Sequence, residues 1–382
     1  MTSNLILIVK SMSTAVIEIK NDIAFGFLNQ LERMNIRNLL LILTLFQFSC
    51  SQKSSNWGTE LVFEFSEMIE HQKLNIDSSV ICGFALDMEI IDSLLVVEDF
   101  LMQDNAINVY NVHSGEVVYR LGFTGRGPGE IVDPSFNIST SENIIQLFEP
   151  NLKKLIEYYL INNDTPRISE YYIPYSKING FVMEVVKVND HFICMGKNQD
   201  FDFNRFIVLD TLYNIEYGTG KYPELVEKLS ISEIQDILYY VCHIALKPDK
   251  KRVAFGSYIG AVLEIFDISG IEENIKNINT IKIYPPIFKF TNRLIWYDET
   301  IIGFEDLFAT DNFIYALLNG SIGSEYQYPK SICVFDWNGN PIKRYITDVP
   351  LRSFAVDEPS KVIFAVTHPD NDNPEFVYFN IM

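Results

Sequence analysis

Three carboxylates in this sequence lie within predicted β-strands, where they could act together as ligands of a hard cation. Glu184 and the adjacent pair Glu305 and Asp306 fall within short apolar runs that are rich in β-forming residues. Carboxylate oxygens are the ligands that Ca²⁺ prefers. One chemical hypothesis is therefore a metal-dependent hydrolase or lyase with a calcium-type site. The alternative is that these acids face water inside the fold, and we assign no residue as a metal ligand and expect no cofactor.

Motifs for other catalytic chemistry are absent from the sequence. No G-x-S-x-G elbow or S-x-x-K motif occurs, so a serine nucleophile lacks support. The histidines form no H-E-x-x-H motif, and His243 lies in an apolar strand pattern typical of a core residue. The Asp-Asn run at residues 370–374 lacks the glycine and distal Glu of an EF-hand, which favours a plain hairpin loop. We assign no catalytic residue.

An export signal ends at Cys50. Residues 34–50 (MNIRNLLLILTLFQFSC) contain Arg37, then a short apolar run, then Ser49 directly before the cysteine. Such a run fits the h-region of a cleaved signal, whereas about 20 apolar residues are needed to span a bilayer. We predict a lipoprotein signal over residues 34–49, lipid attachment at Cys50 and a flexible polar tether over residues 50–57.

The position of this signal bears on residues 1–33. Export signals lie at the start of a chain, so we interpret residues 1–33 as a gene-start artefact or a disordered extension. The alternative is a genuine N-terminal helix followed by a buried apolar helix. Gln47 and Phe48 depart from the usual lipobox, and Ser51 is not the Asp that retains lipoproteins at the inner membrane. We predict an outer-membrane lipoprotein that faces the periplasm.

Composition limits the partners. With 48% hydrophobic and 21% charged residues, the chain is typical of globular proteins. Its net charge of -20 opposes binding to nucleic acid and to an anionic membrane surface, so membrane attachment is expected only through the lipid. No C-x-x-C pair occurs, so zinc-site spacing is absent. The cysteines other than Cys50 are expected to be buried thiols, or else to pair in an oxidising periplasm: Cys82, Cys194, Cys242 and Cys333.

From residue 58 onward, short runs of Val, Ile, Phe and Tyr alternate with turn residues. One pattern recurs: an apolar strand, a turn with Asp, Asn or Ser, and a second, more apolar strand. Successive turns lie roughly 47 to 62 residues apart, which is the spacing of propeller blades with loop insertions. The copies cover residues 84–98, 136–149, 182–195, 241–255, 302–318 and 354–366.

A second hairpin follows several copies, at residues 107–118, 206–215 and 332–342. Each repeat thus contains four antiparallel strands, with Asn338-Gly339 as a clear tight turn. The last copy offers only one further strand, at residues 376–381, and a spare strand lies at residues 60–65.

A ring of sheets must protect its first and last edges. We therefore predict an all-β fold over residues 58–382, a six-bladed β-propeller closed by the N-terminal strand in the last blade. A β-sandwich with a second unit is the competing fold. The helix-like segment at residues 223–239 is interpreted as an insertion.

A loop after the first repeat is rich in glycine. Gly125, Gly127, Pro128 and Gly129 demand unusual backbone angles, and no Gly-Lys-Ser/Thr follows them, so the loop is not a phosphate loop. A loop from an outer strand to the next inner strand is expected on the ligand-binding face, where two of its side chains would reach the central funnel. One hypothesis is that Arg126 contacts an anionic ligand or partner. The alternative is that Arg126 and Glu130 pair and only fix the loop.

The G-x-G-P-G-E motif of this loop (Gly125, Gly127, Pro128, Gly129 and Glu130) resembles that of the TolB-like six-bladed β-propeller lipoproteins of the Bacteroidetes. The repeat count and the lipidated start extend the resemblance over residues 57–382, although the family motif does not predict the insertion at residues 223–239. The resemblance implies the fold and the location. Most such proteins have no assigned activity.

We predict a lipid-anchored binding module of the cell envelope that presents one face to a protein or small ligand, and we prefer binding to catalysis. A rigid ring holds many variable loops on one face, which suits this role. The metal-dependent enzyme is the alternative, and a structural lipoprotein with a large apolar patch is a third possibility. Fold alone does not separate them.

Overall fold

The structure is a computed structural model, and the described residues belong to one unit of the chain, Ser55–Met382. The predicted signal, Cys50, Cys82 and the segment at residues 223–239 lie outside the described residues. The described ranges are 58–77, 85–99, 104–132, 138–141, 143–161, 165–174, 176–178, 181–197, 204–220, 242–285, 289–291, 294–296, 299–367 and 374–382.

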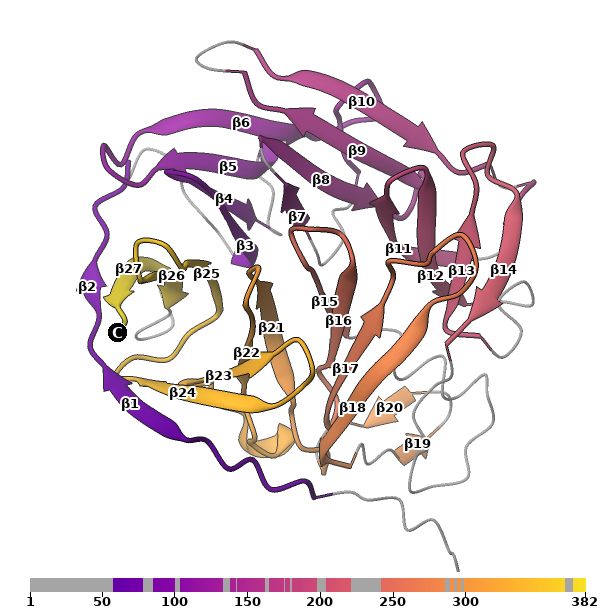
Figure 1. Ribbon diagram of the computed structural model, residues 1–382. Helices are drawn as coiled ribbons and strands as arrows, with labels where there is room; N and C mark the ends of the chain where they lie inside the picture. The colour runs from indigo at the N-terminus through magenta and orange to yellow at the C-terminus, as the bar shows by residue number, and fades with distance from the viewer. Residues whose placement is uncertain are drawn as a thin grey trace, which may run out of the picture. The chain divides into compact units, whose positions relative to one another are not determined.

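Six antiparallel blades follow one another around a central axis (Figure 1). In the first four, the strands occur in the sheet in the order in which they occur in the chain. These blades are β3 (Ala85–Ile91), β4 (Leu94–Asp99), β5 (Asn105–Asn111) and β6 (Val117–Phe123); β7 (Ile138–Ser141), β8 (Ile144–Glu149), β9 (Lys154–Tyr159) and β10 (Arg167–Tyr172); β11 (Phe181–Val188), β12 (His191–Lys197), β13 (Phe206–Leu209) and β14 (Ile215–Thr219); and β15 (Cys242–Leu246), β16 (Arg252–Ser257), β17 (Ala261–Asp267) and β18 (Lys276–Tyr284).

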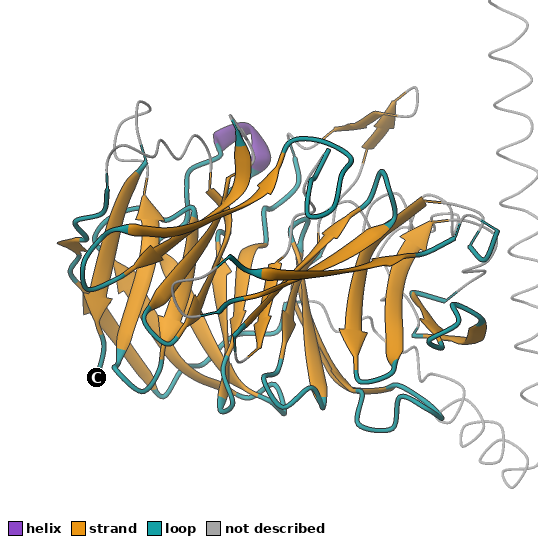
Figure 2. Cartoon of the chain, turned by 90° about the horizontal axis from the view of Figure 1, so that it is seen from above, coloured by secondary structure: helices purple, strands orange, loops and turns teal. Residues whose placement is uncertain are grey.

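The fifth and sixth blades each take a strand from the N-terminal segment. A separate hairpin, β19 (Lys289–Thr291) and β20 (Leu294–Trp296), is inserted between the fourth and fifth blades, and the 3-10 helix η2 (Gly323–Glu325) lies at one face of the ring (Figure 2). The two blades are β21 (Phe304–Ala309), β22 (Phe313–Leu318), β23 (Ser331–Asp336) and β24 (Pro341–Thr347) with β1 (Phe65–Ile69); and β25 (Ser353–Asp357), β26 (Val362–Thr367) and β27 (Glu375–Asn380) with β2 (Gln72–Lys73).

The sequence repeats correspond to the inner half of each blade. All six predicted copies are hairpins of the first and second strands, from β3–β4 to β25–β26. The three predicted second hairpins are β5–β6, β13–β14 and β23–β24. The all-β, six-bladed propeller is therefore confirmed, and its first strands surround the axis: β25 contacts β3, β3 contacts β7, and β21 contacts both β15 and β25.

Apolar side chains between neighbouring blades form the core. Each sheet has an apolar side chain pattern on both faces, because each face packs on another blade. Val96 and Val109 of the first blade, for example, pack with Ile145 of the second. Between the third and fourth blades, the rings of Phe206 and Phe255 lie 4.9 Å apart. These interfaces fix the angle between sheets and so hold the inner strands around one axis.

Closure by the N-terminal segment is confirmed, but residues 60–65 are the wrong strand. The outer place of the sixth blade is taken by β2, which pairs antiparallel with β27, and the N–H of Leu74 donates to the carbonyl of Phe376 at 2.9 Å. The preceding strand, β1, pairs parallel with β24 of the fifth blade. In Figure 1 both strands run along the outside of the ring.

The physical reason for the error lies in the apolar residues before β1. Leu61 and Phe63 pack against the cluster between the fourth and fifth blades, and the Phe63 ring meets that of Phe335 edge-on at 6.2 Å. Thr59 makes one backbone bond to Lys282. Alternating apolar residues can thus be buried by packing across a blade edge without pairing in a β-ladder. Alternation in the sequence is the same for a paired strand and for such a packed segment.

Replacing Leu74 with Ala should lower the free energy of unfolding by about 2 to 4 kcal/mol, because Leu74 is buried beside the closing strand and its removal leaves a cavity. Urea unfolding measures this change. Val62→Ala is the control, since Val62 is 71% exposed, and it should change stability by no more than about 0.5 kcal/mol. Equal effects of the two substitutions would contradict closure at this edge.

Candidate functional site

A funnel opens at the face where the inner strands end. Its volume is about 570 Å³, within the range of small-molecule sites. Four blades contribute residues from the last part of the inner strand or from the turn that follows, and the second blade contributes Ile138, Ser139 and Thr140 of its short inner strand. Its acidic residues are Glu89, Asp92, Asp311, Asp357 and Glu358, and its apolar residues include Ile90, Ile91, Ile138, Ile244, Leu246, Phe308 and Val356.

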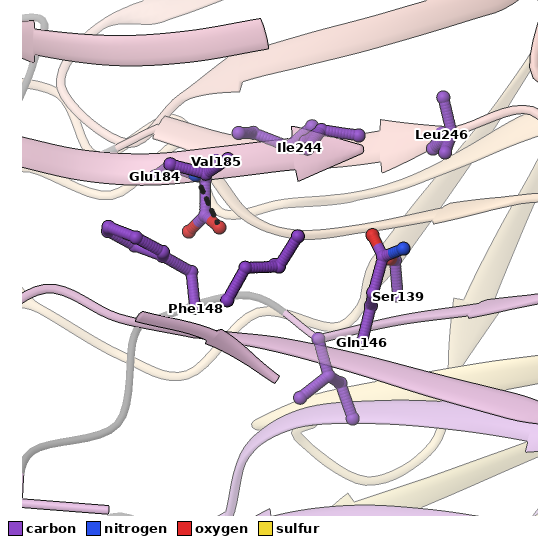
Figure 3. A pocket seen from close by; sticks show the side chains of 10 residues that line it. Ser139, Gln146, Phe148, Glu184, Val185, Ile244 and Leu246 are labelled. Carbon is purple, nitrogen blue, oxygen red and sulfur yellow. Dashed lines mark hydrogen bonds between the residues drawn. The ribbon is translucent and has the colours of Figure 1, made fainter. Parts of the chain in front are cut away.

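A smaller chamber of about 20 Å³ adjoins the funnel, with which it shares Ile138, Ser139, Ile244 and Leu246. Figure 3 shows the side chains of Glu184 and Gln146 at this chamber, one from β11 and one from β8. A space of this size holds about one water molecule. The channel below the funnel is therefore narrow, and its walls are largely desolvated.

Three inner strands carry an acid at a break in the strand register. The irregularities occur at Asp87 in β3, Glu184 in β11 and Asp306 in β21. A β-bulge redirects side chains locally, and each of these acids accepts a bond from the next backbone N–H. The donors are Met88, Val185 and Leu307. The acids are thus part of the backbone geometry of their strands.

Two of these acids also join their blade to the next one. Asp87 accepts the N–H of Ile138, the first residue of β7, at 2.7 Å. Asp306 accepts the N–H of Phe354 at 3.0 Å and the hydroxyl of Ser353 at 2.6 Å, both in β25. Each carboxylate therefore satisfies backbone or hydroxyl donors where one inner strand meets its neighbour, which buried polar groups require.

Burial and mutual repulsion keep protons on the channel acids. Burial raises the pKa of Asp306 to about 7 and, with the charge of Asp306, that of Glu89 to about 8. The pKa of Asp87 is raised well above its usual value by burial and by Asp306. Burial and the charge of Glu184 do the same for Glu98. The channel thus stores ionisable protons near neutral pH.

A group of polar side chains lies around Glu305. Its carboxylate is 3.5 Å from Arg352, accepts the hydroxyl of Tyr326 at 2.9 Å and accepts the side-chain amide of Asn319. Burial nevertheless raises its pKa.

His243, expected in the core, is half-buried on β15, and burial together with the charge of Arg352 lowers its pKa to about 3. His243 is therefore neutral at physiological pH.

The sequence candidates for a metal site do not converge. Glu184, Glu305 and Asp306 lie on inner strands as predicted, but each accepts hydrogen bonds from protein donors. Within the described ranges, no group of three or more His, Cys, Asp or Glu side chains is arranged to hold a metal ion. The hypothesis of a calcium-type enzyme therefore gains no donor set from these residues.

The loop at residues 125–130 lies away from the funnel. It connects the end of β6 to the start of β7, at the face opposite the inner-strand ends, and neither Arg126 nor Glu130 lines the funnel or the chamber. The two side chains that were expected to reach a central funnel are thus not part of the wall of this one. The carboxylate of Glu130 accepts the N–H of Gly127 at 2.6 Å, so it fixes the loop without pairing with Arg126. Ligand binding by exposed Arg126 stays a prediction.

Buried Lys154 holds this loop on the second blade. Its ammonium donates to the carbonyl of Glu130 at 2.7 Å and pairs with Glu170 of β10 at 2.9 Å. Glu170 also accepts the N–H of Gly129 at 2.9 Å. Gly129 has φ +70°, and a Cβ there would lie 2.6 Å from Ile168, which explains why glycine is needed. The motif is thus a clamp between the first and second blades.

Two of the four remaining cysteines have described side chains. Cys194 and Cys333 are free and buried, as expected. Burial raises the pKa of Cys333 to about 11, so this thiol is unreactive at neutral pH. Cys242 belongs to β15.

Sequence reasoning missed Asp87, Glu89 and Glu98 as channel acids. A signal for the first was present, because Asp87, Glu184 and Asp306 all follow a phenylalanine by two or three residues near the start of an inner strand. The turn acids of the funnel were assigned only as turn formers. Their convergence depends on the closed ring and cannot be obtained from spacing.

The fold and this funnel define a six-bladed β-propeller with a central acidic opening. A family model described as TolB-like 6-blade propeller-like matches residues 64–359. The chain belongs to this family, as its loop motif and repeats predict. No curated protein shows significant similarity to the chain.

Three solved structures are similar to this chain at low sequence identity. A putative exported protein from Bacteroides fragilis is 15% identical with a TM-score of 0.48, covering 82% of this chain and 98% of the other. A member of the DUF4221 family from Bacteroides vulgatus is 11% identical with a TM-score of 0.49, covering 84% and 97%. The Cps50 (Swd1) β-propeller domain of Myceliophteria thermophila is 10% identical with a TM-score of 0.45, covering 82% and 100%.

Stability should fall between pH 6.5 and pH 8.5. The pKa of Glu89 is about 8 in the folded protein and near 4.5 when unfolded, so the folded state binds the extra proton and loses this advantage as pH rises. The loss is about 2 kcal/mol for Glu89. His243, whose pKa is lowered to about 3, acts below this window. Chemical unfolding at both pH values measures the change.

Glu89→Gln should reduce this pH dependence, while Glu116→Gln, at an exposed position outside the funnel, should leave it unchanged. A wild-type protein that is equally stable at both pH values would contradict the burial of charge in the channel.

Lys154→Met should destabilise the domain by about 3 kcal/mol, because Glu170 would remain largely buried without its partner. It should also speed trypsin cleavage after Arg126, since the loop loses its clamp. The rate is followed by mass spectrometry of the fragments. Arg167→Met, at an exposed position of the same strand as Glu170, serves as control. Unchanged cleavage in Lys154→Met would refute the clamp.

Proposed function

We propose that the protein is a lipid-anchored binding module of the cell envelope, attached through Cys50, which binds a small ligand in the central funnel. The observation that carries this proposal is the funnel of about 570 Å³ at the ends of the inner strands. Concave sites of this size, with apolar walls and a few polar groups, are typical of ligand pockets. The ring holds the walls of the funnel rigidly, so few of their side chains and loops lose conformational freedom when a ligand binds.

The location rests on the sequence. Residues 34–50 have the charge, apolar run and small residue before cysteine of a lipoprotein signal, and the polar segment that follows suits a tether between membrane and propeller. Among the described residues, no helix has the length and apolar character to cross a bilayer. We place the protein at the outer membrane, facing the periplasm.

Ligand capture tests the binding role. Purified protein is equilibrated with a small-molecule extract of the envelope, re-isolated and analysed by mass spectrometry. Ser139→Trp places an indole ring where the funnel and the chamber meet, since Ser139 lines both, and it should greatly reduce capture of any compound that the wild type retains in the funnel. Ile168→Trp changes an exposed position on β10 and should not. Identical compounds on wild type and Ser139→Trp, with both proteins folded, would overturn the proposal.

Cys50→Ala should abolish incorporation of labelled palmitate in cells and release the protein from the membrane fraction, because the anchor is the only predicted attachment. Cys82→Ala, at a predicted buried thiol, should retain the label. Labelling is measured by autoradiography after immunoprecipitation. Persistent labelling of Cys50→Ala would remove the anchor from the proposal.

A further inference from the structure

Resting on the binding role proposed above, we propose that the funnel selects a small ligand that carries a protonated amine on an apolar body. Three features contribute to this assignment: the charge of the walls, their apolar patches and the position of Glu89 in the wall of the funnel.

The charged side chains that are described in the lining of the funnel all have the same sign, which is negative. Five carboxylates contribute to it, and among the described residues that line it there is no Lys, Arg or His. These acids come from three neighbouring blades, the fifth, sixth and first, so the negative potential is concentrated on one side of the opening. Low-dielectric walls around a cleft concentrate such a field and favour counter-ions inside it. An anionic ligand would meet repulsion from this side of the opening.

Three funnel acids at or just after the ends of the inner strands, Asp311, Asp357 and Glu358, have hydrogen bonds and ion pairs that leave most of their charge uncompensated. Asp357 accepts the backbone N–H of Ser360 at 3.2 Å, and Glu358 accepts the side-chain amide of Asn312 at 3.0 Å. Both donors are neutral. Lys247 is 3.8 Å from Asp311, but it lies at 2.5 Å from Asp249, which is the nearer partner. A ligand cation would therefore find carboxylates that hold few protein cations.

The walls also include apolar side chains that are open to the cavity. Ile244 and Leu246 of β15 are only half-buried although they belong to an inner strand, and Phe308 and Val356 belong to the inner strands of the next two blades. Covering these surfaces with a hydrocarbon body is favourable, because it removes apolar area from water. A bare metal ion or a simple inorganic cation would leave them wet.

Glu89 is the acid best placed to meet the amine. It lines the wall of the funnel, is half-buried, and accepts the Thr140 hydroxyl at 2.9 Å. The charged groups that face it are Asp87 on its own strand and Asp306 of β21. Burial and Asp306 raise the pKa of Glu89 to about 8. An ammonium group that binds there displaces the carboxyl proton to solvent, and an ion pair replaces the neutral acid.

A further acid, Glu98, lies deeper in the channel and lines neither the funnel nor the chamber. Glu98 is fully buried, and in the part of the chain that the structure describes neither carboxylate oxygen has a hydrogen-bond partner. Its backbone lies in register with Asp87, and the charge of Glu184 at the chamber raises its pKa. Unpaired buried acids are costly to stability, and the raised pKa means that Glu98 is held in its neutral form and adds no negative charge to the funnel.

The test uses three probes of one shape. Phenethylamine, 2-phenylethanol and phenylacetate share a phenylethyl-type body and differ in charge, and N-acetyl-lysine methylamide represents a lysine side chain from a peptide. Isothermal titration at low salt should show saturable binding of phenethylamine, with the alcohol and the acid at least tenfold weaker. If the lysine derivative binds equally, the amine source is a peptide; if it does not, the source is a free amine.

Substitutions of single carboxylates test which acid of the funnel contacts the amine. At pH 7, binding of phenethylamine in buffers of different ionisation enthalpy should reveal proton release, and Glu89→Gln should remove that release and weaken binding about tenfold. Glu358→Gln should weaken binding by a smaller factor, and Glu116→Gln, outside the funnel, should match wild type. Folding of each variant is checked by thermal unfolding.

Three outcomes would overturn the assignment: equal affinity for amine and alcohol, tighter binding of phenylacetate, or no binding of either amine. If no amine binds but the capture experiment still yields a compound that Ser139→Trp loses, the ligand class is wrong while the binding role stands. If capture also fails, the proposed function itself fails.

Discussion

Two backbone pairings at the rim of the ring, β1 with β24 and β2 with β27, keep the sheets closed around one axis. A free edge on the last blade would expose unpaired N–H and C=O groups and would let the first and sixth blades separate. The apolar cluster that contains Leu74 and Ile69 spans the fifth, sixth and first blades, so the closing segment also completes the core there. The funnel is made of strand ends from five blades, and it therefore depends on this closure.

Closure has an electrostatic consequence at the axis. Inner strands that approach one another leave little space for water, as the chamber of about 20 Å³ shows. Side chains that face the axis are then desolvated, and several of them are acids. Asp87 and Asp306 offset part of the cost through bonds to the next inner strand, yet burial still raises their pKa values. The raised pKa values thus result from the same packing that holds the ring.

Much of the architecture could be predicted from the sequence, because each blade is encoded locally: an apolar strand, a turn acid or amide, and a second apolar strand recur in every copy. The closing strand could not be identified, because β2 has only two residues, Gln72 and Lys73, and neither carries an apolar signal. Residues 60–65 have that signal, but there it reflects packing of Leu61 and Phe63 on a blade edge. The site was less predictable for a related reason. Asp92, Asp311 and Asp357 are individually ordinary turn residues, and only the ring places them around one opening.

The glycine-rich loop and the funnel lie at opposite faces of the ring, and the charged groups at the two places have different partners. At the loop, Lys154 and Glu170 are bonded to backbone groups and to each other, so their charges are used inside the protein. At the funnel, Asp357 and Glu358 meet neutral donors, and their charges remain available to a ligand. A loop with three glycines has few side chains to offer for recognition, whereas the ends of the inner strands of the first, fifth and sixth blades and the turns after them bring Asp92, Asp311, Asp357 and Glu358 to the funnel. The distinctive glycine-rich motif therefore belongs to the contact between two blades, whereas the funnel that we propose as the binding site lies where ordinary turn residues from separate blades converge.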